Sequence, residues 1–242
     1  MAKDELAKEF KYIGTRPDRP DGFDKVTGRA KYGADVAAVG MLHGAVLRSP
    51  YAHARIKSIN FEKAAKLDGV KAIVTRDDFP VGIDGDTLKL LENTIAGEFA
   101  YYDGHAIAAV AATSVHIAKE AINEIEVKYE VLPHVIDVDE AIKPEAPVVR
   151  ENAGDFSVPE GSSPNVASYI EFGTGDINSG FDKADLVKSG RFKTEAAHQG
   201  YIEPHACMAQ LDHDGQGEMW VCTQGHWYLS LIHISEPTRQ KP

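Results

Sequence analysis

Residues 198–207, HQGYIEPHAC, hold the densest set of side chains that could do chemistry. Two histidines, a glutamine, a tyrosine and a glutamate stand there around Gly200 and Pro204. Polar groups beside a strand that a proline interrupts can line the mouth of a pocket. Glu203 can equally cap or bridge neighbouring backbone, so composition and spacing alone do not lead to a reaction.

Other sequence patterns give no metal or nucleotide site. Four histidines fall between residues 198 and 226, but their spacing matches neither a helical i,i+4 pair nor a compact strand pair of zinc ligands. Gly173 and Gly175 are followed by Gly180, which is the wrong spacing for a dinucleotide-binding loop. The sequence has no Walker, G-x-S-x-G or H-E-x-x-H motif. No residue is therefore assigned as a metal ligand.

Composition predicts an acidic globular protein. The 242 residues include 26 Lys and Arg against 37 Asp and Glu, a formal net charge of −11. This charge repels phosphate backbones, so no nucleic acid is expected as a partner. No apolar run approaches the roughly 20 residues of a membrane span, and the charged start lacks the apolar centre of a secretory signal. We therefore expect a cytoplasmic protein with no membrane span.

The elements that position these side chains follow from hydrophobic periodicity, which predicts a mixed α/β fold. The wholly apolar run at 106–112 predicts a strand buried on both faces, and Thr113 or Ser114 is expected to cap the helix after it. A strand at 127–131 follows, and this strand–helix–strand order predicts a right-handed crossover. Further strands are expected at 41–48, 55–60 and 70–75, with a short helix at 60–67 that Asn60 caps and Gly69 ends.

The second half of the chain opens with a stretch at 139–168 rich in Pro, Glu, Ser and Asn, which is typical of a linker or covering loop. The helix-like FDKADLV follows, with Asn178 or Ser179 as its expected cap. Strands are expected at residues 186–194, 205–212 and 218–223, with the DHDGQG turn at 212–217 between the last two.

Four segments match a known family pattern: 24–35 (DKVTGRAKYGAD), 42–59 (LHGAVLRSPYAHARIKSI), 102–133 (YDGHAIAAVAATSVHIAKEAINEIEVKYEVLP) and 201–226 (YIEPHACMAQLDHDGQGEMWVCTQGH). The most specific parts are RSP at 48–50 with AHA at 52–54, and YEVLP at 129–133. On these residues the chain resembles the molybdenum-binding large subunit of the xanthine dehydrogenase/aldehyde oxidase family, the molybdenum hydroxylases. At 103–105 it has Asp-Gly-His where many members have a Gly-Gln or Gly-Glu pair before proline.

The resemblance implies an α+β, mixed α/β architecture in successive parts. These are an N-terminal arm at 1–24, an a/b hammerhead domain at 25–138, a linker at 139–168 and the truncated start of a molybdopterin-binding domain at 169–227. Residues 228–242 are expected to be a non-native tail.

The resemblance also implies a molybdopterin-dependent oxidoreductase in the full-length parent. Such enzymes hydroxylate or dehydrogenate aldehydes, N-heterocycles or related aromatic substrates, with oxygen from water. The implied cofactor is molybdopterin, as the cytosine dinucleotide. Cys207 and Cys222 are the only cysteines, so iron–sulfur clusters and FAD are expected on an iron–sulfur subunit and an FAD-binding subunit. A dimer of heterotrimers is expected at full length, and the isolated chain is expected to be inactive.

Three residues are implied to bind the cofactor: Gln199, Gln224 and Gly225. A glutamine near the Tyr-x-Glu segment bonds an oxygen on molybdenum in several members, but the offset of Gln199 from Glu203 differs from the xanthine-oxidising pattern, in which Ala197 would align. Gln224 and Gly225 match a Thr-Gln-Gly turn that leads toward the cofactor, and a purely structural role is equally open. No catalytic residue is assigned, because the family's catalytic glutamate is expected beyond residue 242.

Two other functional classes stay open. A partner-binding hammerhead module without catalysis would form a stable monomer that binds its partner without molybdenum. A small zinc hydrolase that uses the histidines would bind zinc stoichiometrically. Metal analysis of the purified protein separates the three.

The tail prediction rests on residues 229–239, LSLIHISEPTR, which match the translation of a transposase sequencing adapter rather than the family. A real amphipathic strand is the alternative. Deleting 228–242 is expected to change the free energy of unfolding by a few tenths of a kcal/mol, because an unselected segment has no reason to fit the packing. A denaturant titration of 1–227 against 1–242 measures this change. A loss above about 2 kcal/mol would show that the tail is packed.

Overall fold

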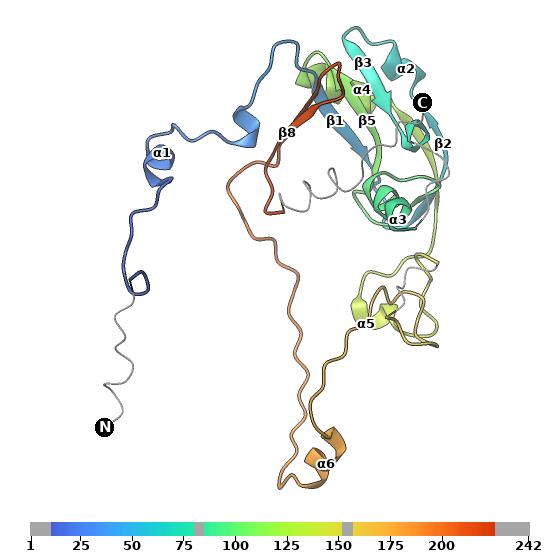
Figure 1. The fold of residues 1–242 in the computed structure, drawn as a ribbon. Helices are drawn as coiled ribbons and strands as arrows, with labels where there is room; N and C mark the ends of the chain where they lie inside the picture. Colours follow the sequence, from blue (N-terminus) through green and yellow to red (C-terminus); the bar gives the residue numbers. More distant parts are fainter. Residues whose placement is uncertain (1–10, 80–84, 152–156, 226–242) are drawn as a thin grey trace. The chain divides into compact units, whose positions relative to one another are not determined.

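The computed structural model describes residues 11–79, 85–151 and 157–225, and the expected tail lies outside them. The backbone forms two compact units. One consists of residues 39–191, and the other combines residues 1–38 with 192–242. Figure 1 shows the helices and strands of both units.

Two three-stranded sheets form the unit 39–191. The first has the order β1-β5-β3 and the second has the order β4-β2-β6, and all of these pairings are antiparallel. Their strands are β1 (His43–Arg48), β5 (Ala106–Ala112), β3 (Val70–Val74), β4 (Phe99–Ala100), β2 (Ala54–Asn60) and β6 (Glu126–Val131). The predicted crossover is wrong, because β5 and β6 lie in different sheets and neither has a parallel neighbour.

Strand β5 is the centre of the first sheet, which explains its wholly apolar sequence. Ala108 and Val110 pack with Ala121 of helix α4 (Val115–Asn123). Ile107 packs on Ile56 and other residues of the second sheet. The strand is therefore covered on both faces, as its sequence predicts.

One of the two helix caps predicted in this unit lies where the sequence places it. Ser114 Oγ accepts the N–H of Ile117 at 3.2 Å at the start of α4. Asn60 Oδ1 accepts the N–H of Glu62 at 3.0 Å before helix α2 (Glu62–Ala65). The predicted cap of α4 at Ser114 is confirmed. The expected cap at Asn60 is wrong, because the N-cap of α2 is Phe61 and the helix has no side-chain cap hydrogen bond. The remaining short elements of the unit are the 3₁₀ turn η2 (Arg76–Asp78) and helices α3 (Gly85–Thr94), α5 (Val138–Ala141) and α6 (Ile177–Asp182).

The RSP segment and the Asp-Gly-His turn interlock. Ser49 is buried, its N–H donates to His105 O at 2.8 Å, and its carbonyl accepts the N–H of Gly104 at 2.8 Å. The Arg48 guanidinium donates to Gly104 O, also at 2.8 Å. Ser49 Oγ accepts the N–H of Tyr51 at 3.1 Å. The most specific motif of the sequence thus fixes the end of β1 to the turn that begins β5.

His105 is fully buried beside this turn. Its Nδ1 accepts the N–H of Tyr101 at 3.2 Å, and its ring stacks on Tyr102 with the centroids 4.3 Å apart. Burial lowers the pKa of His105, and the Glu92 carbonyl opposes that shift. The native state therefore favours the neutral imidazole.

This burial predicts a loss of stability in acid. Below the ordinary histidine pKa of 6.5 the unfolded chain binds a proton that native His105 resists, so the free energy of unfolding falls as the pH drops below 6.5. One such group contributes up to about 1.4 kcal/mol per pH unit. Urea titrations between pH 7 and pH 5 should show this slope reduced in His105→Asn and kept in His116→Asn, whose histidine is exposed. An unchanged slope in His105→Asn would contradict the assignment.

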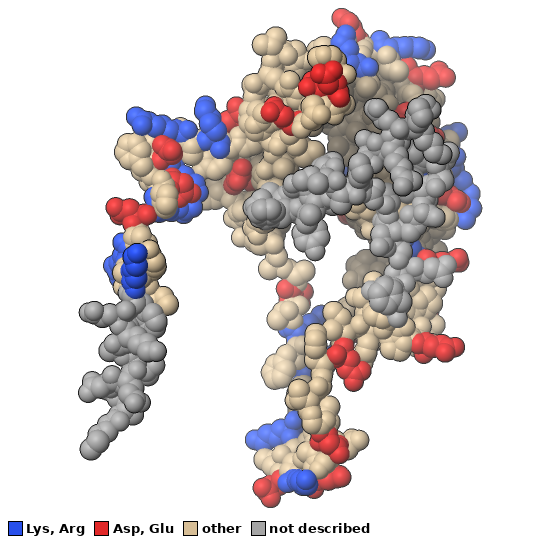
Figure 2. Space-filling model, viewed as in Figure 1, with Lys and Arg blue, Asp and Glu red and all other residues tan. Residues whose placement is uncertain are grey.

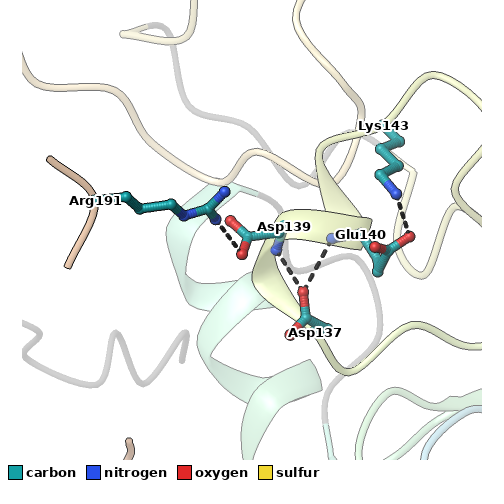
Figure 3. Close-up of polar contacts among 5 residues, drawn as sticks. All are labelled: Asp137, Asp139, Glu140, Lys143 and Arg191. Carbon is teal, nitrogen blue, oxygen red and sulfur yellow. Dashed lines mark hydrogen bonds and ion pairs between the residues drawn. The ribbon is translucent and has the colours of Figure 1, made fainter. Parts of the chain in front are cut away.

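The segment after residue 137 is tied together by side chains (Figure 3). Asp137 Oδ1 accepts the N–H groups of Asp139 and Glu140 at the start of α5, at 2.9 and 3.2 Å. Asp139 forms an ion pair with Arg191. Further along, Asn165 donates to the carbonyls of residues 141 and 147 at 3.1 and 3.0 Å and accepts the N–H of residue 149 at 3.1 Å.

Two expectations in the following stretch are wrong. Helix α6 is capped by Asp176, whose Oδ1 accepts the N–H of Ser179 at 3.0 Å, and not by Asn178 or Ser179. The predicted strand at 186–194 is absent from this described stretch, which is exposed throughout. Its apolar alternation has no neighbouring strand to pair with there, so no ladder forms.

The second unit is built around a hairpin of β7 (Cys207–Leu211) and β8 (Gly217–Val221). Asp212 Oδ1 accepts the N–H groups of Asp214 and Gln216 at 3.0 and 2.8 Å, which confirms the predicted turn. The unit also holds helix α1 (Gly22–Val26) and the 3₁₀ turn η1 (Gly33–Asp35), which contacts β7.

Charged residues of both signs alternate on the face shown in Figure 2, without a continuous basic area among the residues that the structure describes. On the second sheet Lys57 pairs with Glu130, and Lys63 pairs with Glu126 at 2.6 Å. None of the described helices is both long and apolar enough to cross a bilayer.

Candidate cofactor-binding site

The Thr-Gln-Gly turn lies directly after strand β8. Thr223 Oγ1 accepts the N–H of Gly225 at 3.0 Å and closes a tight turn around Gln224. The Gln224 side chain is exposed and has no hydrogen-bond partner in the described part of the chain. This turn thus presents a free carboxamide.

Gln199 lies on the exposed segment that precedes β7. Gly200 has a φ of +67°, and its N–H donates to His198 Nδ1 at 3.1 Å. The Tyr201 ring contacts His198 and His205, with centroid distances of 4.9 and 4.7 Å. These contacts shape the backbone around Gln199, which is itself exposed.

The hairpin register brings both segments to one end. Cys207 pairs with Val221, and the N–H of Cys222 donates to Ala206 O at 3.2 Å. The 212–217 turn closes the opposite end. The segment before β7, which carries Gln199, and the segment after β8, which carries Gln224, therefore leave the hairpin at the same end. No hydrogen bond joins the two glutamine side chains among the described residues.

Gly33 approaches the same end of the hairpin. A Cβ at this position would lie 3.3 Å from Ala206 O, which is tighter than most real contacts, and 3.5 Å from Cys222 N, which is an ordinary contact. Turn η1, which begins at Gly33, thus rests on the backbone of the last hairpin pair. Sequence reasoning missed this role, because the close approach involves residues far apart in the chain and has no local pattern.

These residues suit a polar, oxygen-rich cofactor better than a metal ion bound directly. Carboxamide N–H groups donate to phosphate and oxo oxygens, and the close approach of Gly33 leaves backbone in place of side chains at this end. The described residues contain no group of three or more His, Cys, Asp or Glu placed to hold a metal.

The acidic residues of Figure 3 are engaged with protein groups instead. Asp139 pairs with Arg191, and Glu140 pairs with Lys143 at 2.6 Å. Asp137 accepts backbone N–H groups. These carboxylates would have to give up their partners to bind a cation, so the contacts seen here do not favour a zinc site for the hydrolase alternative.

Comparison with known proteins places both halves of the chain in one family. Residues 27–133 match the family model described as aldehyde oxidase and xanthine dehydrogenase, a/b hammerhead domain. Residues 158–234 match the model for a molybdopterin cofactor-binding domain. The chain belongs to the aldehyde oxidase and xanthine dehydrogenase family. The predicted fold, a hammerhead domain followed by the start of a molybdopterin-binding domain, is confirmed.

Two relatives that are named for different dehydrogenases are similar to the chain. It is 35% identical to a probable xanthine dehydrogenase subunit from Bacillus subtilis (strain 168), over 90% of the chain and 28% of that protein. It is 28% identical to the nicotinate dehydrogenase large molybdopterin subunit of Eubacterium barkeri, over 92% of the chain and 50% of that protein. The chain thus spans between about a quarter and half of the length of these relatives.

A solved structure of the family has the same fold. The carbon monoxide dehydrogenase of Oligotropha carboxidovorans matches with a TM-score of 0.74 and 29% identity, over 91% of this chain and 29% of that one. The hairpin with Gln224 and Gly225, and the segment with Gln199, both lie inside the match to the molybdopterin cofactor-binding domain.

Proposed function

We propose that this chain is part of a molybdopterin-dependent oxidoreductase and that Gln199, Gln224 and Gly225 contribute to its cofactor site. The observation that carries the proposal is that the segments leading to Gln199 and to Gln224 both leave the β7–β8 hairpin at the same end, within residues matched by the cofactor-binding model. When bound, the cofactor supplies the redox chemistry by which such enzymes hydroxylate or dehydrogenate a substrate.

The residues of this chain hold the cofactor rather than transform the substrate. The carboxamides of Gln199 and Gln224 donate hydrogen bonds to cofactor oxygens. The Gly225 N–H is already bonded to Thr223 Oγ1, so Gly225 acts by keeping the turn compact while Gln224 projects from it. Gly33 keeps the neighbouring backbone accessible because it adds no side chain.

The whole enzyme requires more than this chain. The two relatives are named as subunits, and the chain covers only 28% and 50% of them. An iron–sulfur subunit would bind the iron–sulfur clusters and an FAD-binding subunit would bind FAD. Cys207 and Cys222 of this chain cannot by themselves hold a four-cysteine cluster. We propose that the assembly is a cytoplasmic dimer of heterotrimers that binds the cofactor as the cytosine dinucleotide. Within this chain we assign the hammerhead domain to 25–138 and the start of the molybdopterin-binding domain to 169–227.

The substrate is proposed as a class, namely an aldehyde, an N-heterocycle or a related aromatic compound. Relatives at similar identity are named for xanthine and nicotinate. No described residue of the cofactor site separates these choices.

The decisive experiment uses the full-length parent purified with its partners from the native host. Molybdenum is expected by elemental analysis, and turnover is expected from the complex but not from the 242-residue chain alone. A complex without molybdenum would overturn the proposal and favour the partner-binding module. Turnover by the isolated chain would contradict its expected inactivity.

The site assignment predicts a specific loss on substitution. Gln199→Ala and Gln224→Ala in the parent are each expected to weaken cofactor retention by about tenfold, the lower end of the effect of losing a supporting hydrogen bond at a metal centre. Molybdenum per complex after dialysis measures retention. Gln210→Ala, an exposed position in β7, is the matched control and should retain the parental content. Equal retention in all three variants would refute the assignment.

A further inference from the structure

A cavity of about 500 Å³ opens in the unit 39–191 beside strand β4. The 3₁₀ turn η2, the end of helix α3 and the residues around β4 enclose it. Its apolar walls come from the rings of Phe79, Phe99 and Tyr101. The volume falls within the range of small-molecule sites.

Arg76 is the unmatched charge of this cavity. Its side chain is half-buried, yet it has no hydrogen bond or ion pair with any described residue. Its stem lies against Gly97, where a Cβ would come within 3.3 Å of Arg76 Cγ. The Thr75 N–H donates to Asp78 Oδ2 at 2.7 Å and closes the turn that carries Arg76. A half-buried arginine without a partner among the described residues favours an anionic ligand.

The carboxylates of the cavity do not satisfy Arg76. Glu92 pairs with Arg150, and Glu98 lies 3.6 Å from the guanidinium of Arg55. Asp77 is exposed, so water and salt screen its charge. The charge left for a ligand to neutralise is therefore the positive charge of Arg76.

The aromatic walls are arranged for a planar ligand. The rings of Phe99 and Tyr101 lie at 28° to each other, with their centroids 6.1 Å apart. Arg55 lies over Phe99 at 5.0 Å and Arg150 lies over Tyr101 at 4.7 Å from the ring centroids. These cations offset the negative potential of the ring faces, which reduces the repulsion that an anion would meet.

We propose that this cavity binds a small planar aromatic carboxylate. The carboxylate forms a bidentate pair with Arg76, and the ring of the ligand packs against Phe79, Phe99 and Tyr101. The site uses neither glutamine of the cofactor site, so it stands or falls separately from the proposed redox function.

Benzoate is the test ligand, titrated into the 242-residue chain and followed by ligand-detected saturation-transfer NMR. A dissociation constant of about 1 mM is expected for so small a ligand. Benzamide keeps the ring but lacks the charge, and cyclohexanecarboxylate keeps the charge but lacks the planar ring. Both should bind at least about tenfold more weakly, since each lacks one of the two required features.

Arg76→Gln should weaken benzoate binding at least about tenfold, because it removes the charged pair. Arg16→Gln, an exposed arginine in the other unit, is the matched control and should bind as the parent does. Gly97→Ala is a second test variant. Its new methyl group displaces the Arg76 side chain and should also weaken benzoate binding. No saturable binding to the parent, equal binding of benzamide, or an unchanged constant in a folded Arg76→Gln variant would each overturn the proposal.

Discussion

Replacing Gly69 with alanine is expected to lower the free energy of unfolding by about 3 kcal/mol. Gly69 has a φ of +92°, and a Cβ there would lie 2.6 Å from Thr113 Oγ1 and 2.7 Å from Ile117 Cδ1. The Gly69 carbonyl also accepts the N–H of Thr113 at 2.9 Å, which holds the two backbones together, so the contact can be relieved only by moving the Thr113 and Ile117 side chains from their packed positions. Urea denaturation of the full chain measures the loss.

Gly104→Ala is the matched control for this prediction. Gly104 has a similar φ of +85°, but nothing lies within 4 Å of an added Cβ. It should lose only about 1 kcal/mol, the cost of a left-handed conformation for a residue with a side chain. The difference between the two variants isolates the steric clash at Gly69, and equal losses would show that no clash exists.

Ile107→Ala should cost about 3 kcal/mol. Ile107 is fully buried in β5, where it packs with Ala96, Ala100 and the apolar face of the second sheet. Its small neighbours cannot extend into the space left by the lost methyl and methylene groups, so a cavity remains. Thermal and urea unfolding should both report the change.

Ile136→Ala makes the same substitution where the side chain is 88% exposed. Its effect should stay within about 0.5 kcal/mol. A loss below about 1 kcal/mol for Ile107→Ala would mean that the two sheets adjust to fill the space, contrary to the packing described above.

Local patterns predicted much of the unit 39–191. The apolar run that forms β5 and the cap at Ser114 depend only on neighbouring residues, and the structure confirms both. Strand β4 was not predicted, since two residues carry no periodicity and the strand exists through its pairing with Ala54 and Arg55. The crossover was wrong because a buried central strand has the same sequence pattern whether its neighbours are parallel or antiparallel.

The candidate site shows the same division between local and distant information. The turn around Gln224 follows from neighbouring residues, and Thr223 closes it with a local hydrogen bond. The place of Gly33 against Ala206 depends on two segments that the intervening unit separates in sequence. The family resemblance supplied the identities of the three proposed cofactor residues, whereas the hairpin register explains why the segments before β7 and after β8 leave at one end.

The division of the chain also governs the order in which it can fold during synthesis. Residues 39–191 interrupt a unit whose two parts lie before and after them, and Gly33 meets Ala206 only once the second part has been made. Closing an unstructured loop of that length would cost about 4 kcal/mol, and this cost falls when the inserted segment has already folded. Residues 11–38 leave the ribosome before the inserted unit but find their partners only after it has been made, so a chaperone that holds the nascent chain would meet them unpaired in the meantime.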